Sequence, residues 1–157
     1  MTASLSELKK ELQTLPPAKV LELCMHLAKY KKENKELLNY LLFESYNVES
    51  YIKDNKIQIE EQFETVNKSS LYLAKKTIRK ILRNTNKYIK YSGSKQVEVE
   101  LLICFCKTLK NSGIAMHSST ALMNIYERQL LKINKALATL HEDLQHDYLE
   151  ELRGVNG

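Results

Sequence analysis

Glycine and proline are scarce in this chain. Its 157 residues include four glycines and two prolines, and the prolines are adjacent, at Pro16 and Pro17. Sheet proteins need a turn every few residues, and these two residue types supply most turns. The sequence therefore predicts an all-α fold with long helices. The four glycines are also too widely spaced to form the glycine-rich loops that bind mononucleotides or dinucleotides.

The length and composition are those of a folded protein with one core. Apolar residues make up 43% of the chain and charged residues 27%, close to the averages for globular domains. A chain of this length buries roughly 70% of the surface that it exposes when unfolded. We expect a single helical domain over residues 1–157, with about seven helices in antiparallel hairpins. A helical bundle and a short irregular α-superhelix both fit this pattern.

The first predicted helix is short and has clear ends. Ser4 and Glu7 have the spacing of a capping box, and Pro16 and Pro17 end this helix and begin the next. Its apolar stripe repeats every three or four residues: Leu5, Leu8, Leu12 and Leu15.

Three further helices are predicted before residue 67. The second runs from about residue 17 to 32, and the third from about 35 to 44 with Asn34 as its cap. Asn47 caps the fourth. The fourth helix has a predicted inner face of Val48, Tyr51, Ile52, Ile59, Phe63 and Val66.

The second half of the chain predicts a basic helix, an apolar helix and a long helical region. Ser69 or Ser70 opens the basic helix, and the turn YSGSK closes it near Tyr91. The next helix begins near Ser94, contains LLICFC and ends at NSG, with Gly113 as a left-handed cap. It is apolar nearly all round, so we place it at the centre of the fold. The last region begins near residue 119 and extends through the leucine repeat toward residue 152.

The strongest chemical signal lies in the basic helix. The segment AKKTIRKILRNTNKYIKY, residues 74–91, holds seven Lys and Arg and no acidic residue. At about 100° per residue, six of these fall within an arc about 100° wide, opposite a stripe that contains Ile78 and Ile81. The arc is about 21 Å long at 1.5 Å per residue. These six candidate anion-binding or partner-binding residues are Lys76, Arg79, Lys80, Arg83, Lys87 and Lys90.

Three interpretations of these charges are open. They can be solvated or paired internally, for example with the acidic stretch EDLQHDYLEE at residues 142–151. They can bind a nucleic-acid backbone, or an acidic protein or membrane surface. Residues 75–95 carry eight basic and no acidic side chains, which leaves 16 basic against 19 acidic residues elsewhere. We expect an interaction or scaffold module that presents this helix to an anionic or acidic partner, with a non-specific nucleic-acid-binding accessory domain as the alternative.

The sequence contains no recognisable motif for catalysis or metal binding. The four histidines form no HExxH pair, and Cys104 and Cys106 lie two residues apart on a helix, so that they point to different sides. We therefore expect neither an enzyme nor a cofactor or metal. The N-terminus is amphipathic and no stretch approaches about eighteen apolar residues, so we expect a cytoplasmic protein without a transmembrane segment. The sequence indicates no oligomeric state.

The chain also resembles a known family. The segments LKKELQTLPPAKVLELCMHLAKYKKENKELLNYL, AKKTIRKIL, VELLICF and YERQLLKI are similar to those of a family of uncharacterised all-helical bacterial domains of similar length. This resemblance implies a helical fold and a bacterial source, and it implies no activity. Members carry a Gly-Trp-Gly-like segment near the C-terminus, whereas this chain lacks tryptophan and ends YLEELRGVNG.

Overall fold

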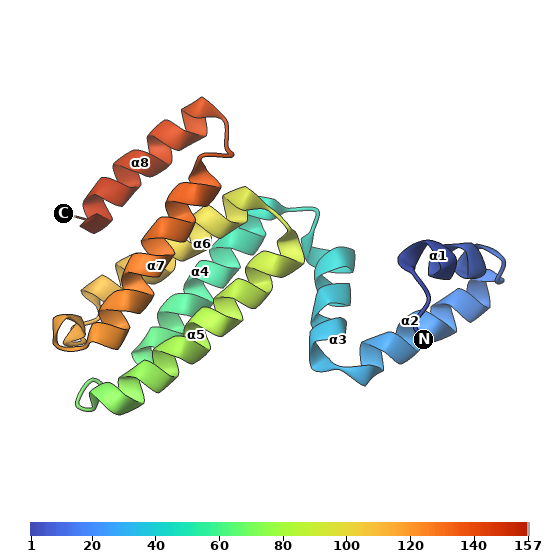
Figure 1. The fold of residues 1–157 in the computed structure, drawn as a ribbon, viewed down its shortest axis with the longest axis horizontal. Helices are drawn as coiled ribbons and strands as arrows, with labels where there is room; N and C mark the ends of the chain where they lie inside the picture. The colour runs from blue at the N-terminus through green and yellow to red at the C-terminus, as the bar shows by residue number, and fades with distance from the viewer. Residues whose placement is uncertain (157) are drawn as a thin grey trace. The chain divides into compact units, whose positions relative to one another are not determined.

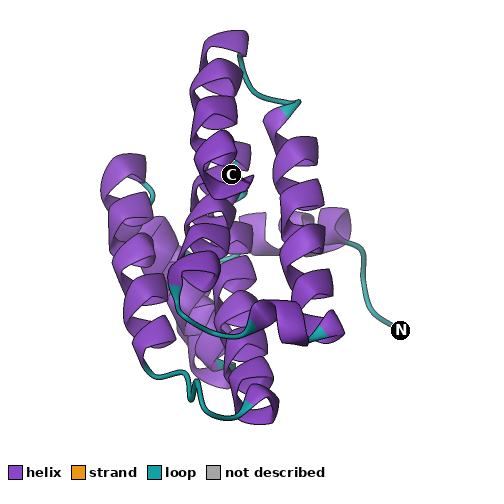
Figure 2. Ribbon diagram, turned by 90° about the vertical axis from the view of Figure 1, so that its left-hand side faces the viewer, coloured by secondary structure: helices purple, strands orange, loops and turns teal. Residues whose placement is uncertain are grey.

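The computed structural model describes residues 1–156, and within them the protein is all-α, as predicted (Figure 1). It contains eight α-helices, a π-helical turn and a 3₁₀ turn, and no strand among the described residues (Figure 2). The chain divides into two compact units, Met1–Phe43 and Glu44–Gly157, called unit 1 and unit 2 below. A single domain over residues 1–157 stays a prediction. The division into two compact units does not test it, because it does not show whether unit 1 and unit 2 unfold together.

Unit 1 contains α1 (Leu5–Gln13), α2 (Pro17–Tyr30) and α3 (Lys32–Asn39). The predicted capping box is present: the Ser4 backbone N–H donates to Glu7 Oε2 over 2.7 Å, and the Glu7 N–H donates to Ser4 Oγ over 3.3 Å. Pro17 occupies the first turn of α2, where its missing N–H costs nothing. The boundaries of α1 and α2 therefore follow the sequence signals.

The third helix differs from its prediction. It begins at Lys32, because Lys31 is extended (φ −139°) and separates it from α2. Asn34 is not the cap; it lies inside the helix, and its Nδ2 donates to the Leu27 carbonyl over 2.8 Å. The helix ends at Asn39 and continues as a π-helical turn over Tyr40–Glu44.

Unit 2 is a helical bundle built around α6. Its helices are α4 (Val48–Glu64), α5 (Leu71–Ser92), α6 (Lys95–Asn111), α7 (Thr120–Leu137) and α8 (Glu142–Asn156), with the 3₁₀ turn Met116–Ser118 before α7. Helix α6 contacts α4, α5, α7 and α8 (Figure 1). Most of its residues are buried, including all six of LLICFC. The prediction of a central apolar helix is confirmed.

Side-chain caps fix the starts of four helices in unit 2. Asn47, Ser70, Ser94 and Ser119 each accept a backbone N–H from three residues downstream, over 3.0 to 3.3 Å. Gly93 and Gly113, just beyond α5 and α6, have φ of +59° and +80°. Both lie in the left-handed region that glycine adopts without steric cost.

Two predictions for unit 2 were wrong. Val48 is 41% exposed, because it is the first residue of α4 and lies before the helix turns its apolar face inward; the other predicted inner-face residues are buried. The last helical region is two helices, α7 and α8, rather than one. The Thr139 hydroxyl donates to the Ala136 carbonyl near the end of α7. The Gln145 amide donates to the Leu140 carbonyl in the connection to α8, and this connection contains no glycine or proline.

Candidate functional site

Helix α5 is attached to the bundle along one apolar face. Ala74, Ile78, Ile81 and Thr85 are buried, and the helix packs on α4 and α6. Thr85 was not part of the predicted apolar stripe. Its hydroxyl donates to the Ile81 carbonyl over 2.8 Å, so a polar side chain is buried with its hydrogen bond satisfied.

The six predicted basic residues lie on the other side of α5, and we call them the basic face. Lys76, Arg79, Lys80, Arg83 and Lys90 are exposed. Lys87 is half-buried, and its Nζ lies 5.2 Å from the centre of the Tyr88 ring, within range of a cation–π interaction. The structure therefore places all six residues on α5, with five of the charges fully available to solvent.

These five exposed side chains form no hydrogen bond or ion pair with any residue in 1–156. Like charges three and four residues apart on a helix destabilise it by a few tenths of a kcal/mol per pair. No carboxylate of the described chain offsets the repulsion among these five side chains through a direct contact. The five exposed residues of the basic face are thus an uncompensated cluster of positive charge.

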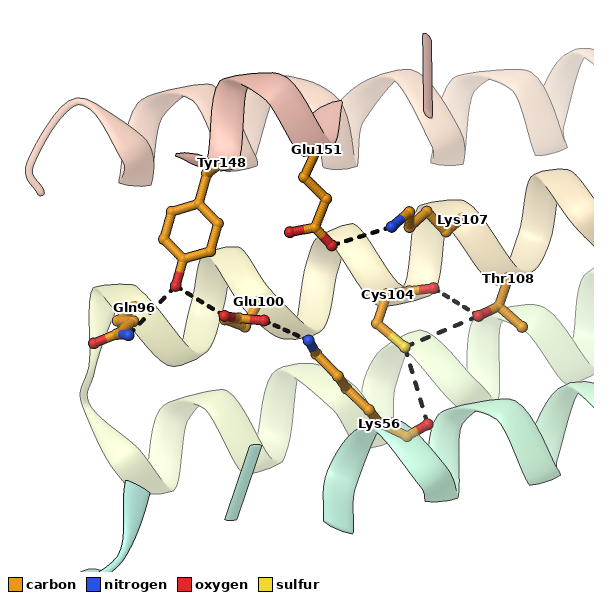
Figure 3. Close-up of polar contacts among 8 residues, drawn as sticks. All are labelled: Lys56, Gln96, Glu100, Cys104, Lys107, Thr108, Tyr148 and Glu151. Atoms are coloured by element: carbon orange, nitrogen blue, oxygen red, sulfur yellow. Dashed lines mark hydrogen bonds and ion pairs between the residues drawn. The ribbon is translucent and has the colours of Figure 1, made fainter. Parts of the chain in front are cut away.

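The acidic stretch at residues 142–151 interacts elsewhere. Glu151 pairs with Lys107 of α6 over 3.2 Å (Figure 3). Glu150 lies 3.5 Å from His146 on its own helix. Helix α8 packs on α6, and within the described residues no ion pair joins it to α5. The structure thus contains no ion pair between the exposed residues of the basic face and this stretch.

A second polar cluster joins α4, α6 and α8 (Figure 3). The carboxylate of Glu100 pairs with Lys56 through Oε2, and its Oε1 accepts from the Tyr148 hydroxyl over 2.9 Å. Gln96 donates to the same hydroxyl over 3.3 Å. Each of these four side chains thus has a hydrogen-bond or ion-pair partner within the cluster, which is typical of a structural clasp, a set of polar contacts that holds α8 to the bundle.

The pKa shifts in this cluster have physical causes that agree with its geometry. Burial by itself lowers the pKa of the Lys56 ammonium, but the hydrogen bond and the charge of Glu100 outweigh it, and the pKa is raised. Burial, together with the neighbouring Glu100 carboxylate, raises the pKa of Tyr148 to about 12. Both shifts stabilise the protonated forms, so neither group is poised for proton transfer near neutral pH.

The cysteines are free thiols, and two of them lie in the core. Burial raises the pKa of Cys106 to about 12 and also raises that of Cys104. Protonated thiols of this kind are poor nucleophiles and metal ligands. Across residues 1–156, no three His, Cys, Asp or Glu side chains lie close enough together to hold a metal ion.

In the part of the chain that the structure describes, no helix combines the length and the apolar character needed to cross a bilayer. Comparison with protein-family models, with curated proteins and with solved structures gave no match. The resemblance to a bacterial helical family stays a prediction.

Proposed function

We propose that this protein is a non-enzymatic helical interaction module whose basic face on α5 binds an anionic partner. One observation carries the proposal: five exposed Lys and Arg side chains share a helix face and have no acidic partner among the described residues. In the unbound protein, the basic side chains of α5 repel one another, and a partner that supplies negative charge relieves this repulsion. Binding therefore also stabilises α5.

An acidic protein surface is the partner that the surroundings of the basic face favour. Tyr72 is 74% exposed and Leu73 43% exposed, both at the N-terminal end of α5. Protein interfaces depend on a few aromatic or aliphatic anchors beside a charged rim, and tyrosine is enriched among such anchors. An acidic partner that covers these two residues would gain apolar burial in addition to ion pairs.

A nucleic-acid backbone is the second candidate, and the regular spacing of the charges favours it. The basic face extends about 21 Å along one helix, long enough to reach several consecutive phosphates. Tyr72 lies on the same arc and is exposed, so it could stack on an unpaired base. The face offers no set of residues for reading base sequence, so binding of this kind would be non-specific.

The proposal needs no cofactor and places the protein in the bacterial cytoplasm. Three free cysteines support a reducing compartment, and the family resemblance supports the bacterial source. The described residues include no membrane-spanning helix, which is compatible with this location.

Fluorescence anisotropy at two salt concentrations tests the proposal. Labelled single- and double-stranded RNA and DNA, and a labelled acidic peptide, are titrated with wild type and with Arg79→Glu/Arg83→Glu. The matched control is Arg128→Glu/Lys135→Glu, which makes the same change of charge at exposed positions on α7. We expect binding to be lost in the α5 variant and retained in the control.

The salt dependence separates the two candidates. Six phosphate contacts give a slope of log affinity against log salt of roughly −5, and three contacts give roughly −3. If the acidic peptide binds, and if Tyr72→Ala weakens this binding at high salt, the result indicates that the partner is an acidic protein. Absence of binding to every probe at low salt, or equal losses in the α5 and α7 variants, would contradict the proposal.

A further inference from the structure

Unit 1 has almost no core of its own. Ala28 and Tyr40 are its only buried residues, and neither α1 nor α3 buries any side chain. Of the twenty large apolar side chains that are exposed in the described chain, thirteen lie in unit 1, although it has fewer than a third of the residues. Short helices in water depend on tertiary packing of their apolar faces. The apolar faces of α1, α2 and α3 therefore need a further surface to cover them.

Helix α2 is apolar over too wide an arc for one neighbour. At about 100° per residue, its apolar side chains span about 220°, whereas a helix with one covered face needs an arc of roughly 100°. Its one packing neighbour in unit 1 with more than marginal contact is α3. Leu21 and Met25 are 64% and 43% exposed on one side of Cys24, and Leu27 is 61% exposed on the other.

Helix α1 presents a second apolar stripe. Leu5, Leu8 and Leu12 are 85%, 45% and 42% exposed, and their spacing of three and four is that of the contact positions of a coiled coil. Lys9 and Glu11 flank this stripe on opposite sides. When two such helices pair in parallel, the basic flank of one meets the acidic flank of the other.

We propose that a second copy of this chain covers the exposed apolar side chains of α1 and α2, and that the protein is a dimer through unit 1. The apolar surface consists of Leu5, Leu8, Leu12, Leu21, Met25 and Leu27, with neighbouring apolar residues around it. An isologous interface brings the same patch of two copies together, and a largely aliphatic patch with flanks of opposite charge is self-complementary.

The available area is of the size that a dimer needs. A large apolar side chain removes about 60–120 Å² of apolar surface from water when it is fully buried. The six residues of the apolar surface average slightly more than half exposure, which gives roughly 200–400 Å² per copy. A standard interface buries about 800 Å² per partner, of which about 450 Å² is apolar. Apolar stems of flanking lysines can supply the difference.

Sedimentation equilibrium of the full chain tests the dimer. We expect wild type to have twice the 18.2 kDa mass of one chain, with dissociation on dilution. Leu8→Glu/Leu21→Glu places charges in the apolar surface without emptying a core, because both side chains are exposed, and it should be monomeric with unchanged helix content by circular dichroism. The control is Leu131→Glu, at a side chain 71% exposed on α7, which should remain dimeric.

A measurement on wild type alone guards against a variant that fails to fold. In hydrogen–deuterium exchange, peptides from α1 and α2 should lose protection on dilution, while peptides from α6 keep theirs. A monomer at every concentration, or protection of α1 and α2 that is independent of concentration, would overturn the proposal. So would a dimer that Leu131→Glu dissociates and Leu8→Glu/Leu21→Glu does not.

Discussion

At the scale of single residues, Tyr148 is the side chain whose role in the bundle can be isolated most cleanly. Its hydroxyl donates to the Glu100 carboxylate over 2.9 Å, and the residue as a whole is only 6% exposed. Because the acceptor is charged, we expect Tyr148→Phe to lower the free energy of unfolding by about 1–2 kcal/mol. This change in the free energy of unfolding is measured by urea denaturation, with circular dichroism as the signal. Tyr72→Phe, at an exposed residue, should have no measurable effect, and equal stabilities of the two variants would contradict the clasp.

The same residue makes stability fall at alkaline pH. The pKa of Tyr148 is raised from 10.0 to about 12 in the folded chain, so the folded state favours the neutral phenol. This stabilisation is complete below pH 10 and is lost as pH rises toward 12. Tyr148→Phe should therefore lose stability less steeply than wild type over this range, as measured by urea denaturation at successive pH values. Cys106, whose pKa is also about 12, contributes to both proteins alike. Parallel pH profiles would show that Tyr148 is not the group responsible.

At the scale of the helices, two glycines should respond to alanine in opposite directions. Gly93 ends α5 at φ +59°, where an L-residue is strained, so Gly93→Ala should lower the free energy of unfolding by about 1 kcal/mol. Gly154 lies within α8 and a Cβ there meets no atom within 4 Å. Gly154→Ala should raise stability by about 0.5 kcal/mol through its better helix propensity. Thermal unfolding measures both, and shifts of the same sign would exclude this explanation.

Helix α5 should become more stable when its basic face is weakened. Arg79 has like charges at Lys75, Lys76 and Arg83, each three or four residues away. Arg79→Glu converts these repulsions into attractions, so the free protein should gain about 1 kcal/mol while partner binding declines. Arg79→Gln should give about half this gain. A loss of stability on thermal unfolding would instead indicate that Arg79 has a stabilising role in the free protein.

Local signals predicted most of the helix starts that a single side chain caps, although Asn34 is not the cap of α3. Ser4, Asn47, Ser70 and Ser94 all act as caps, because a cap depends only on residues three positions apart. The end of α7 was missed because Thr139 satisfies the Ala136 carbonyl and Gln145 satisfies the Leu140 carbonyl in the connection to α8, and neither residue type is a usual stop signal. The basic face was predictable from helical periodicity. That its five exposed residues form no ion pair with the acidic residues of α8 depends on where α8 packs, which no local pattern encodes.

At the scale of the whole molecule, the two units contribute differently to stability and to binding. Unit 2 buries a continuous core around α6, while unit 1 exposes apolar side chains over α1 and α2. The sequence pattern of unit 1 is that of ordinary amphipathic helices, so it predicted a shared core and did not reveal the division at residue 43. Periodicity shows which face of a helix is apolar, but it does not show what covers that face.

A dimer through unit 1 would carry two basic faces, and the binding of long polyanions should reveal this. A ligand that spans both faces gains from effective concentration, by a factor of about 10² or more, whereas a ligand that fills one face does not. We therefore expect Leu8→Glu/Leu21→Glu to bind short acidic probes as wild type does and to bind long ones more weakly. Anisotropy titrations over a series of probe lengths measure this, with Leu131→Glu as the control. The outcome against this prediction is an affinity that rises equally with probe length in wild type and in the monomeric variant. Added length would then strengthen binding only through further contacts with one basic face, and the two faces of the dimer would bind independently.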